Sequence, residues 1–185
     1  PDAGAREALQ KTQQRIATIA QVNRRLYTTD DVEFVAMDDY LAGLADDIGS
    51  TWSTGSARRT VVAAVDPIRL STDKAVALGM IANEWVSNAC KYAYGDAENG
   101  EIRLYLRQTG DREIELSVED EGPGMPANGA VKGTGLGTKL IDALARTNKA
   151  DVRYGAVSDA GARPGMRASI TLKLQAKDVR LSSEE

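Results

Sequence analysis

The chain has 185 residues, of which 42% are hydrophobic; its net charge at pH 7 is −4 and its pI is near 5.0. This length is enough for one main domain with a sizeable core and a small appendage. An acidic chain is not expected to bind nucleic acid or an anionic membrane. No apolar run reaches the length of a membrane span, and no signal peptide opens the chain. Because the chain starts at Pro1, we expect a fragment or a processed chain, with room for a sensor or an anchor upstream.

The chain contains one cysteine, Cys90, and no histidine. A lone cysteine forms no intramolecular disulfide, which is typical of a reducing compartment, so we expect a cytoplasmic protein. We interpret Cys90 as a small apolar residue on a buried helix face, with a reactive thiol as the alternative. The absence of histidine excludes Ser/His/Asp and Cys/His catalysis, histidine zinc sites and a histidine phosphoacceptor within these residues.

An amphipathic helix over residues 5–27 is the first predicted element. Its seam follows alternating steps of three and four residues, as in a coiled coil: Leu9, Thr12, Ile16, Ile19, Asn23 and Leu26. The pattern fits a helix packed on its own domain or one arm of a helical hairpin. The polar seam residues would weaken packing but fix the register.

Two more helices and a strand are expected before the middle of the chain. The spacing predicts a helix over 37–48, with one apolar side formed by Met37, Tyr40, Leu41, Leu44 and Ile48. Residues 60–65 read as a strand that ends at Asp66-Pro67. A long helix is predicted over 72–93, with Ser71 as its N-cap.

The second half of the chain predicts two hairpins separated by a helix. Alternation marks two strands, at Ile102, Leu104 and Leu106 and at Ile114, Leu116 and Val118, with Thr109-Gly110-Asp111 as their turn. A glycine-rich segment, a helix to about Ala145 and strands near 151–157 and 166–174 follow, and we expect a frayed tail after Leu174. This order predicts an α+β fold with a mixed or antiparallel sheet and helices on one face.

Polar residues on the long helix are the first candidates for chemistry. Glu84 and Asn88 are four residues apart and share a helix face, and Lys91 falls near the same stripe. A carboxylate, an amide oxygen and an ammonium in this arrangement suit a nucleotide with Mg²⁺. An ordinary solvated helix face is the alternative.

Two glycine-rich segments are the next candidates. Asp120-Glu121-Gly122-Pro123-Gly124 follows a strand, so its aspartate is placed to accept a hydrogen bond from adenine while the glycines let the backbone approach the ring. A solvent-facing turn is the alternative. Gly133-Thr134-Gly135-Leu136-Gly137 leads into a helix and can form an anion nest. It is neither a Walker loop nor a dinucleotide-binding fingerprint.

Together, the three segments resemble the ATP-binding boxes of the GHKL superfamily. Residues 83–92 resemble its N box, residues 120–124 its Asp-x-Gly-x-Gly box and residues 133–137 its second glycine box. The resemblance covers about residues 60–174 and implies a Bergerat-type ATP-binding sandwich preceded by an N-terminal helix.

The N-terminal part is similar to one class of this superfamily, the HWE-related histidine kinases. The run from Ala5 to Tyr27 resembles the second helix of their phosphoacceptor hairpin. The resemblance implies a truncated hairpin over 1–30, a catalytic ATP-binding domain over 31–174 and a polar tail over 175–185. The phosphorylated histidine would lie on a helix upstream of Pro1.

The resemblance also assigns a role to each matching residue. Glu84 is expected to act near the γ-phosphate as a base or an orienting group, and Asn88 to coordinate Mg²⁺. Asp120 is expected to recognise adenine. The remaining nucleotide-binding residues implied are Lys91 and Tyr92 near phosphate or ribose, Gly122 and Gly124 beneath the base, and Gly133, Gly135, Leu136 and Gly137 at the phosphates.

The sequence departs from the family pattern at two places. The family often has threonine after the glycine that opens the last strand, where this chain has Gly165-Met166. Its usual Gly-Gly after the last helix is replaced by Asn148-Lys149-Ala150, where Asn148 is a candidate for the left-handed conformation of a helix end.

The leading hypothesis is therefore ATP-dependent transfer of a phosphoryl group to the upstream histidine, followed by relay to the receiver domain of a response regulator. The expected partners are ATP, Mg²⁺ and that receiver domain. A second copy of the chain is a candidate partner through the hairpin, although the pattern does not fix the oligomeric state. A degenerate GHKL domain that serves as a phosphotransfer scaffold or partner-binding module is one alternative. Another GHKL enzyme is the second, and the helix over 5–27 argues against it.

Overall fold

A computed structural model describes residues 33–53, 57–95, 98–124, 136–158 and 163–180. The predicted helix over 5–27 lies outside these residues. The helices and strands are β1 (Phe34–Ala36), α2 (Met37–Trp52), β2 (Arg59–Val65), β3 (Arg69–Ser71), α3 (Thr72–Tyr92), β4 (Gly100–Gly110), β5 (Glu113–Asp120), α4 (Leu136–Asn148), β6 (Asp151–Gly155), β7 (Met166–Lys173), a 3-10 helix (Ala176–Asp178) and β8 (Val179–Arg180).

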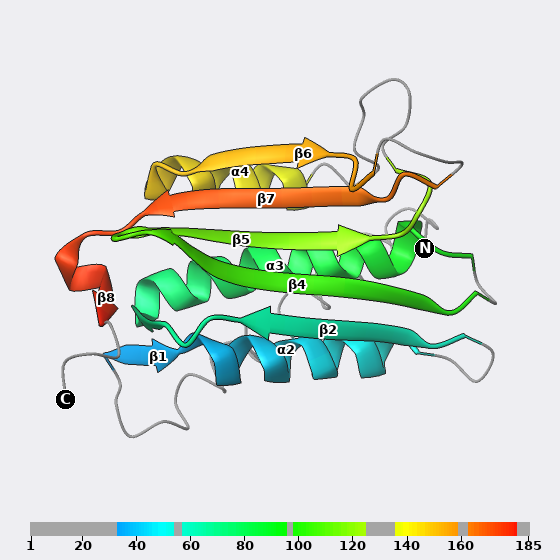
Figure 1. The fold of residues 1–185 in the computed structure, drawn as a ribbon, viewed down its shortest axis with the longest axis horizontal. Coiled ribbons are helices and arrows are strands. Elements are labelled where there is room, and N and C mark those ends of the chain that lie inside the picture. Colours follow the sequence, from blue (N-terminus) through cyan, green and yellow to red (C-terminus); the bar gives the residue numbers. More distant parts are fainter. Residues whose placement is uncertain (1–32, 54–56, 96–97, 125–135, 159–162, 181–185) are drawn as a thin grey trace, which may run out of the picture.

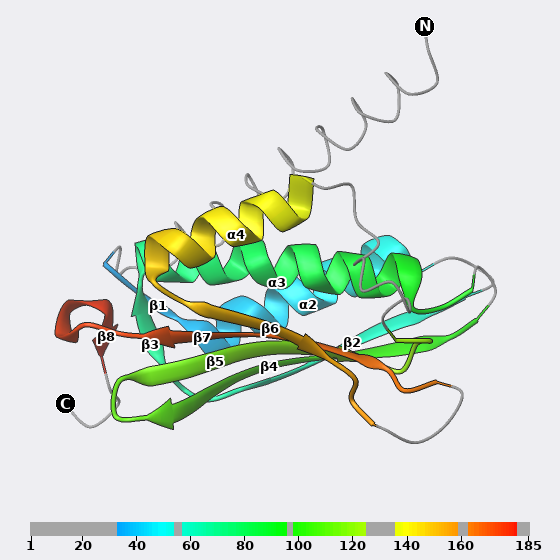
Figure 2. The same cartoon turned by 90° about the horizontal axis from the view of Figure 1, so that it is seen from above.

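The main sheet has five strands in the order β2-β4-β5-β7-β6 (Figure 1). Strands β2 and β4 are parallel, and the other pairs are antiparallel. Helices α2, α3 and α4 lie on one face of this sheet (Figure 2). The prediction of an α+β fold with a mixed sheet and helices on one face is confirmed. Among the helices that the structure describes, none is long and apolar enough to cross a membrane.

The core lies between the helices and the sheet, where the predicted alternation places apolar side chains. Leu104 on β4 lies opposite Val118 on β5, and both side chains are buried. On α3, Leu78, Ile81 and Trp85 recur at steps of three and four residues and are buried as well. The alternation in β4 and β5 therefore fixes which face of the sheet packs against the helices.

The C-terminal end of α3 is held by a buried arginine. The Nε of Arg59 donates to the carbonyl of Cys90 at 3.2 Å, and its Nη2 donates to the carbonyl of Gly95 at 3.0 Å. A cation here also complements the helix dipole. Cys90 is buried, and burial raises the pKa of its thiol to about 12, so the interpretation as an apolar core residue is confirmed.

Several element boundaries differ from the sequence prediction. Helix α2 continues to Trp52, and the hairpin turn lies at residues 111–112 because β4 runs through Gly110. Ser71 precedes α3 as predicted, yet its side chain makes no capping hydrogen bond. The prediction of a frayed tail is wrong for residues 176–180, which form the 3-10 helix and β8. Strand β8 pairs with β3 in a small sheet of order β1-β3-β8.

The end of α4 differs from the prediction as well. Lys149, not Asn148, has the left-handed backbone, with φ of 52°. The N–H of Lys149 donates to the carbonyl of Arg146 at 3.2 Å, and the N–H of Ala150 donates to the carbonyl of Ala145 at 2.9 Å. This pair of bonds is a Schellman motif, in which the residue after the helical cap must be left-handed. Asn148 is the last helical residue and accepts a hydrogen bond from Lys74.

Candidate functional site

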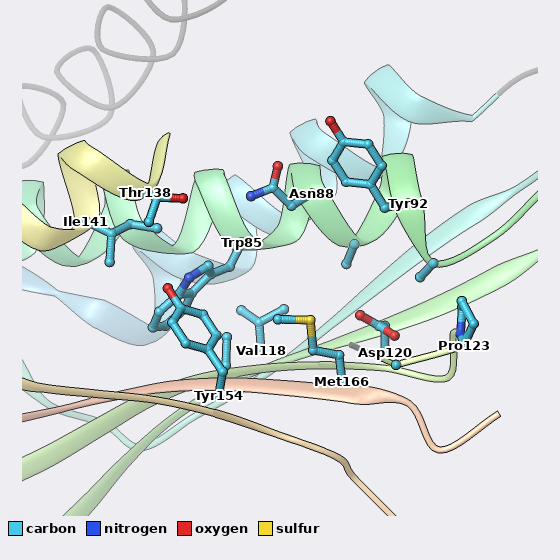
Figure 3. Close-up of a pocket in the computed structure, with 14 residues that line it drawn as sticks. Trp85, Asn88, Tyr92, Val118, Asp120, Pro123, Thr138, Ile141, Tyr154 and Met166 are labelled. Carbon is cyan, nitrogen blue, oxygen red and sulfur yellow. The ribbon is translucent and has the colours of Figure 1, made fainter. Parts of the chain in front are cut away.

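A cavity of about 300 Å³ lies between α3, the main sheet and the start of α4 (Figure 3). It is lined by Trp85, Asn88, Ala89, Tyr92, Ala93, Val118, Asp120, Pro123, Gly124, Thr138, Ile141, Tyr154, Met166 and Ala168. Four predicted site residues are among them: Asn88, Tyr92, Asp120 and Gly124. The fold therefore brings the polar face of α3 against the glycine turn that follows β5.

The carboxylate of Asp120, at the end of β5, lies buried in the cavity wall. Asp120 is 7% exposed, and its Oδ1 accepts a hydrogen bond from the N–H of Gly122 at 2.8 Å. Burial raises the pKa of this carboxyl above its ordinary value, while the N–H groups of Gly122 and Met166 and the charges of Arg103 and Arg163 oppose the rise. A buried acceptor in a cavity wall is suited to a ligand with an N–H donor.

Two glycines let the chain after β5 form the cavity wall. A Cβ on Gly122 would lie 2.7 Å from the Cα of Ala93, so this position accepts only glycine while the turn packs against the end of α3. Gly124 has φ of +75°, a conformation that favours glycine. The Asp-x-Gly-x-Gly pattern therefore provides a carboxylate and a close backbone wall in one turn.

The polar residues of α3 divide into two groups. Asn88 and Tyr92 both line the cavity. Asn88 is half-buried, and Tyr92 is 37% exposed. Lys91 does not line the cavity; its Nζ lies 4.9 Å from the centroid of the Tyr92 ring. Glu84 is half-buried one turn before Asn88 and does not line the cavity either. The structure thus brings Asn88, Tyr92 and Asp120 together, whereas Glu84 and Lys91 lie beside this group.

The second glycine box is described only in part. Gly133 and Gly135 lie outside the described residues, so their expected contact with phosphate stays a prediction. Leu136 begins α4, and the buried Gly137 follows in its first turn. The helix therefore starts beside the cavity, where its first N–H groups have no partner within the helix.

Ten of the lining residues were not predicted as site residues; they include Trp85, Thr138, Ile141, Tyr154 and Met166. Met166 stands where the family often has threonine, and its side chain lies beside Asp120 and Val118 (Figure 3). Thr138 directly follows the second glycine box, and this position is a second local signal. The others face the cavity through the packing of α3, α4 and β6, which spacing along the sequence does not reveal.

The residues present fit an adenine nucleotide and its metal ion. The buried acceptor of Asp120 matches an exocyclic amine, and the apolar side chains of Val118 and Met166 in the same cavity lining suit the face of a flat ring. The amide of Asn88 supplies an oxygen of the kind that Mg²⁺ binds.

Comparison with protein families agrees with this geometry. The family model for the histidine kinase-like ATPase domain matches residues 51–162, and the model described as histidine kinase matches residues 1–52. The chain belongs to the histidine kinase-like ATPase domain family. The resemblance to a GHKL domain joined to an HWE-type phosphoacceptor region is confirmed. Membership of an ATPase domain family implies ATP binding.

Curated relatives include two proteins of Erythrobacter litoralis. Blue-light-activated histidine kinase 1 is 26% identical over 168 residues, which are 90% of this chain and 44% of that protein. Blue-light-activated histidine kinase 2 is 24% identical over 113 residues, which are 60% of this chain and 32% of that protein. The chain thus spans less than half the length of either relative.

Solved structures share the fold. The Erythrobacter litoralis EL346 blue-light activated histidine kinase aligns with a TM-score of 0.72 at 19% identity, over 89% of this chain and 55% of that one. The mycobacterial sensor histidine kinase MprB aligns with a TM-score of 0.61 at 21% identity, over 76% of this chain and 96% of that one.

Proposed function

We propose that this domain binds ATP with Mg²⁺ and transfers the γ-phosphoryl group to a histidine on a helix upstream of Pro1. The phosphoryl group would then pass to an aspartate on the receiver domain of a response regulator. The observation that carries the proposal is the buried carboxylate of Asp120 in the cavity wall, beside the apolar side chains of Val118 and Met166. These two features form an adenine site within a domain of the histidine kinase-like ATPase family.

Five of the predicted site residues then have a defined task. Asp120 accepts a hydrogen bond from the adenine amine, and the turn at Gly122 and Gly124 lies against the base. Asn88 is the residue that would hold Mg²⁺, and the ion supplies charge neutralisation of the phosphates. Tyr92 lies at the more exposed part of the cavity lining, near ribose or phosphate.

Glu84 is proposed to act on the attacking histidine, as a base or an orienting carboxylate. Its place on α3, one turn before Asn88, lets it act next to the nucleotide without lining the cavity. Lys91 is proposed to place a positive charge near the phosphates, because its Nζ lies over the ring of Tyr92. Catalysis would then depend mainly on positioning and electrostatic stabilisation.

Calorimetric titration with ATP and GTP in the presence of Mg²⁺ tests the proposal. Guanine presents a carbonyl where adenine has its amine, so it would face the Asp120 carboxylate acceptor to acceptor. We expect ATP to bind at least about tenfold more tightly than GTP, which corresponds to about 1.4 kcal/mol. Equal affinities, or no binding of ATP, would contradict the proposed function.

A further inference from the structure

Arg163, in the segment before β7, connects parts of the chain that surround Asp120. Its Nε donates to the carbonyl of Glu121 at 2.9 Å, and its Nη2 donates to the carbonyl of Ala93 at 3.1 Å. Its Nη1 forms an ion pair with Glu98. One guanidinium therefore links the segment before β7 to the end of α3, to the turn after β5 and to the segment before β4.

The bond to Glu121 reaches the Asp120 carboxylate through a single peptide group. The carbonyl of Glu121 and the N–H of Gly122 belong to the same peptide unit, and that N–H donates to the Oδ1 of Asp120 at 2.8 Å. Hydrogen bonds in series polarise one another and fix one another's direction. The guanidinium of Arg163 thus stands at the start of a chain of bonds that ends on the carboxylate.

The bond to Ala93 holds the opposite wall. Ala93 lines the cavity, and its carbonyl oxygen would lie 2.9 Å from a Cβ on Gly122, so the end of α3 and the turn after β5 are in close contact. Tyr94 supports the same contact, because its hydroxyl accepts a hydrogen bond from the N–H of Glu121 at 3.1 Å. Arg163 therefore bonds both segments at this contact, the turn after β5 through Glu121 and the end of α3 through Ala93.

We propose that Arg163 is a positioning residue for base recognition, which orients the Asp120 carboxylate toward the adenine amine through the Glu121–Gly122 peptide group. Arg163 does not line the cavity and so acts through other residues. The inference rests on the proposed function, because it presumes that adenine occupies the cavity. The competing view is that Arg163 only anchors its own loop, in which case its loss would weaken every nucleotide equally.

Binding of ATP and of purine riboside 5′-triphosphate, which lacks the exocyclic amine, separates these views. We expect the wild-type chain to prefer ATP at least about tenfold. Arg163→Gln is expected to lower this preference to about threefold or less, while the affinity for the amine-free nucleotide stays within about twofold. Arg153→Gln is the matched control, because Arg153 is 78% exposed, forms an ion pair with Asp151 on the same strand and should keep the full preference.

An unchanged preference for ATP in Arg163→Gln, or an equal loss for both nucleotides, would overturn the inference. Should the glutamine variant fail to fold, Arg163→Lys gives the same comparison, because lysine keeps the charge but cannot reproduce the three bonds.

Hydrogen exchange of the Gly122 amide, measured by NMR without nucleotide, separates this inference from the proposed function. Exchange at least about tenfold faster in Arg163→Gln supports the positioning of Asp120, and unchanged exchange contradicts it. If the wild-type chain binds neither nucleotide, both the proposed function and the role of Arg163 in base recognition are contradicted.

Discussion

The indole ring of Trp85 and the phenol ring of Tyr154 meet edge to face, with centroids 6.2 Å apart and ring planes at 81°. Trp85 lies on α3 and Tyr154 on β6, and both rings line the cavity (Figure 3). Burial raises the pKa of Tyr154, so its hydroxyl stays protonated at neutral pH. The two rings form an aromatic wall of the cavity away from Asp120. The indole of Trp85, an intrinsic fluorophore, therefore borders the cavity.

The fluorescence of Trp85 is therefore expected to report occupation of the cavity. Titration with Mg·ATP should change the tryptophan emission of the wild-type chain. Trp85→Phe should abolish the change, whereas Trp52→Phe should keep it, because Trp52 ends α2 and does not line the cavity. A change that persists in Trp85→Phe and vanishes in Trp52→Phe would place the nucleotide elsewhere.

Asn88→Ala is expected to weaken binding of Mg·ATP at least about tenfold, because it removes an amide oxygen from the cavity. The half-buried position should tolerate alanine without loss of the fold. Asp73→Ala is the control, since Asp73 is exposed on the same helix, outside residues 83–92, and does not line the cavity. Calorimetry at saturating Mg²⁺ measures both affinities; equal affinities of Asn88→Ala and the control would refute the assignment.

Asp120→Asn is expected to raise the free energy of unfolding at pH 7 while removing the preference for adenine. The pKa of the folded Asp120 carboxyl lies above its unfolded value, mainly because of burial, so its ionisation destabilises the folded chain. The wild-type chain is relieved of this penalty as the pH falls through the folded pKa. The difference between variant and wild type should therefore shrink on acidification. Urea denaturation at several pH values measures it, and a variant less stable than wild type at pH 7 would contradict the prediction.

Lys149→Gly is expected to stabilise the domain. Lys149 occupies the left-handed position of the Schellman motif after α4, which strains a residue with a Cβ. The greater flexibility of glycine in the unfolded chain offsets part of the gain, so we expect an increase of about 0.5–1 kcal/mol in the free energy of unfolding. Lys149→Ala, which keeps the Cβ, serves as the control and should bring no gain.

The sequence predicted the elements whose patterns are long. The alternation in β4 and β5 and the steps of three and four residues in α2 and α3 placed the core, because burial on one face imposes those periods. Strands β1, β3 and β8 have three residues or fewer, too few to show a period, and they were missed. The polar composition after Leu174 gave no sign that Asp178 is buried. Its carboxylate accepts a hydrogen bond from the N–H of Gln175.

The site was predictable where residues act locally. Asp120, Gly122 and Gly124 belong to one turn, and Asn88 lies one helical turn after Glu84, so local spacing indicated them. Tyr92 lies on the same helix, but its role was implied only by the resemblance to the N box. Cavity residues contributed by packing between distant elements, such as Tyr154, carry no local signal. Arg163 carries none either, because its bonds reach Ala93 and Glu121 across the fold.

Formation of phosphohistidine tests the central claim most directly. The measurement uses a longer protein that carries the proposed histidine helix ahead of Pro1, with ATP labelled at the γ-phosphate. Glu84→Gln keeps the size of the side chain and removes its charge. Because Glu84 is proposed to act in the transition state, its loss should affect the rate of phosphorylation more than the affinity for ATP. We expect the ATP affinity of this variant to stay within about threefold of wild type and its phosphorylation rate to fall about 10²-fold or more. The matched control is Glu101→Gln, whose side chain is 51% exposed on β4 and which should react at the wild-type rate. A wild-type protein that forms no phosphohistidine, or a Glu84→Gln variant that forms it at the wild-type rate, would contradict the account.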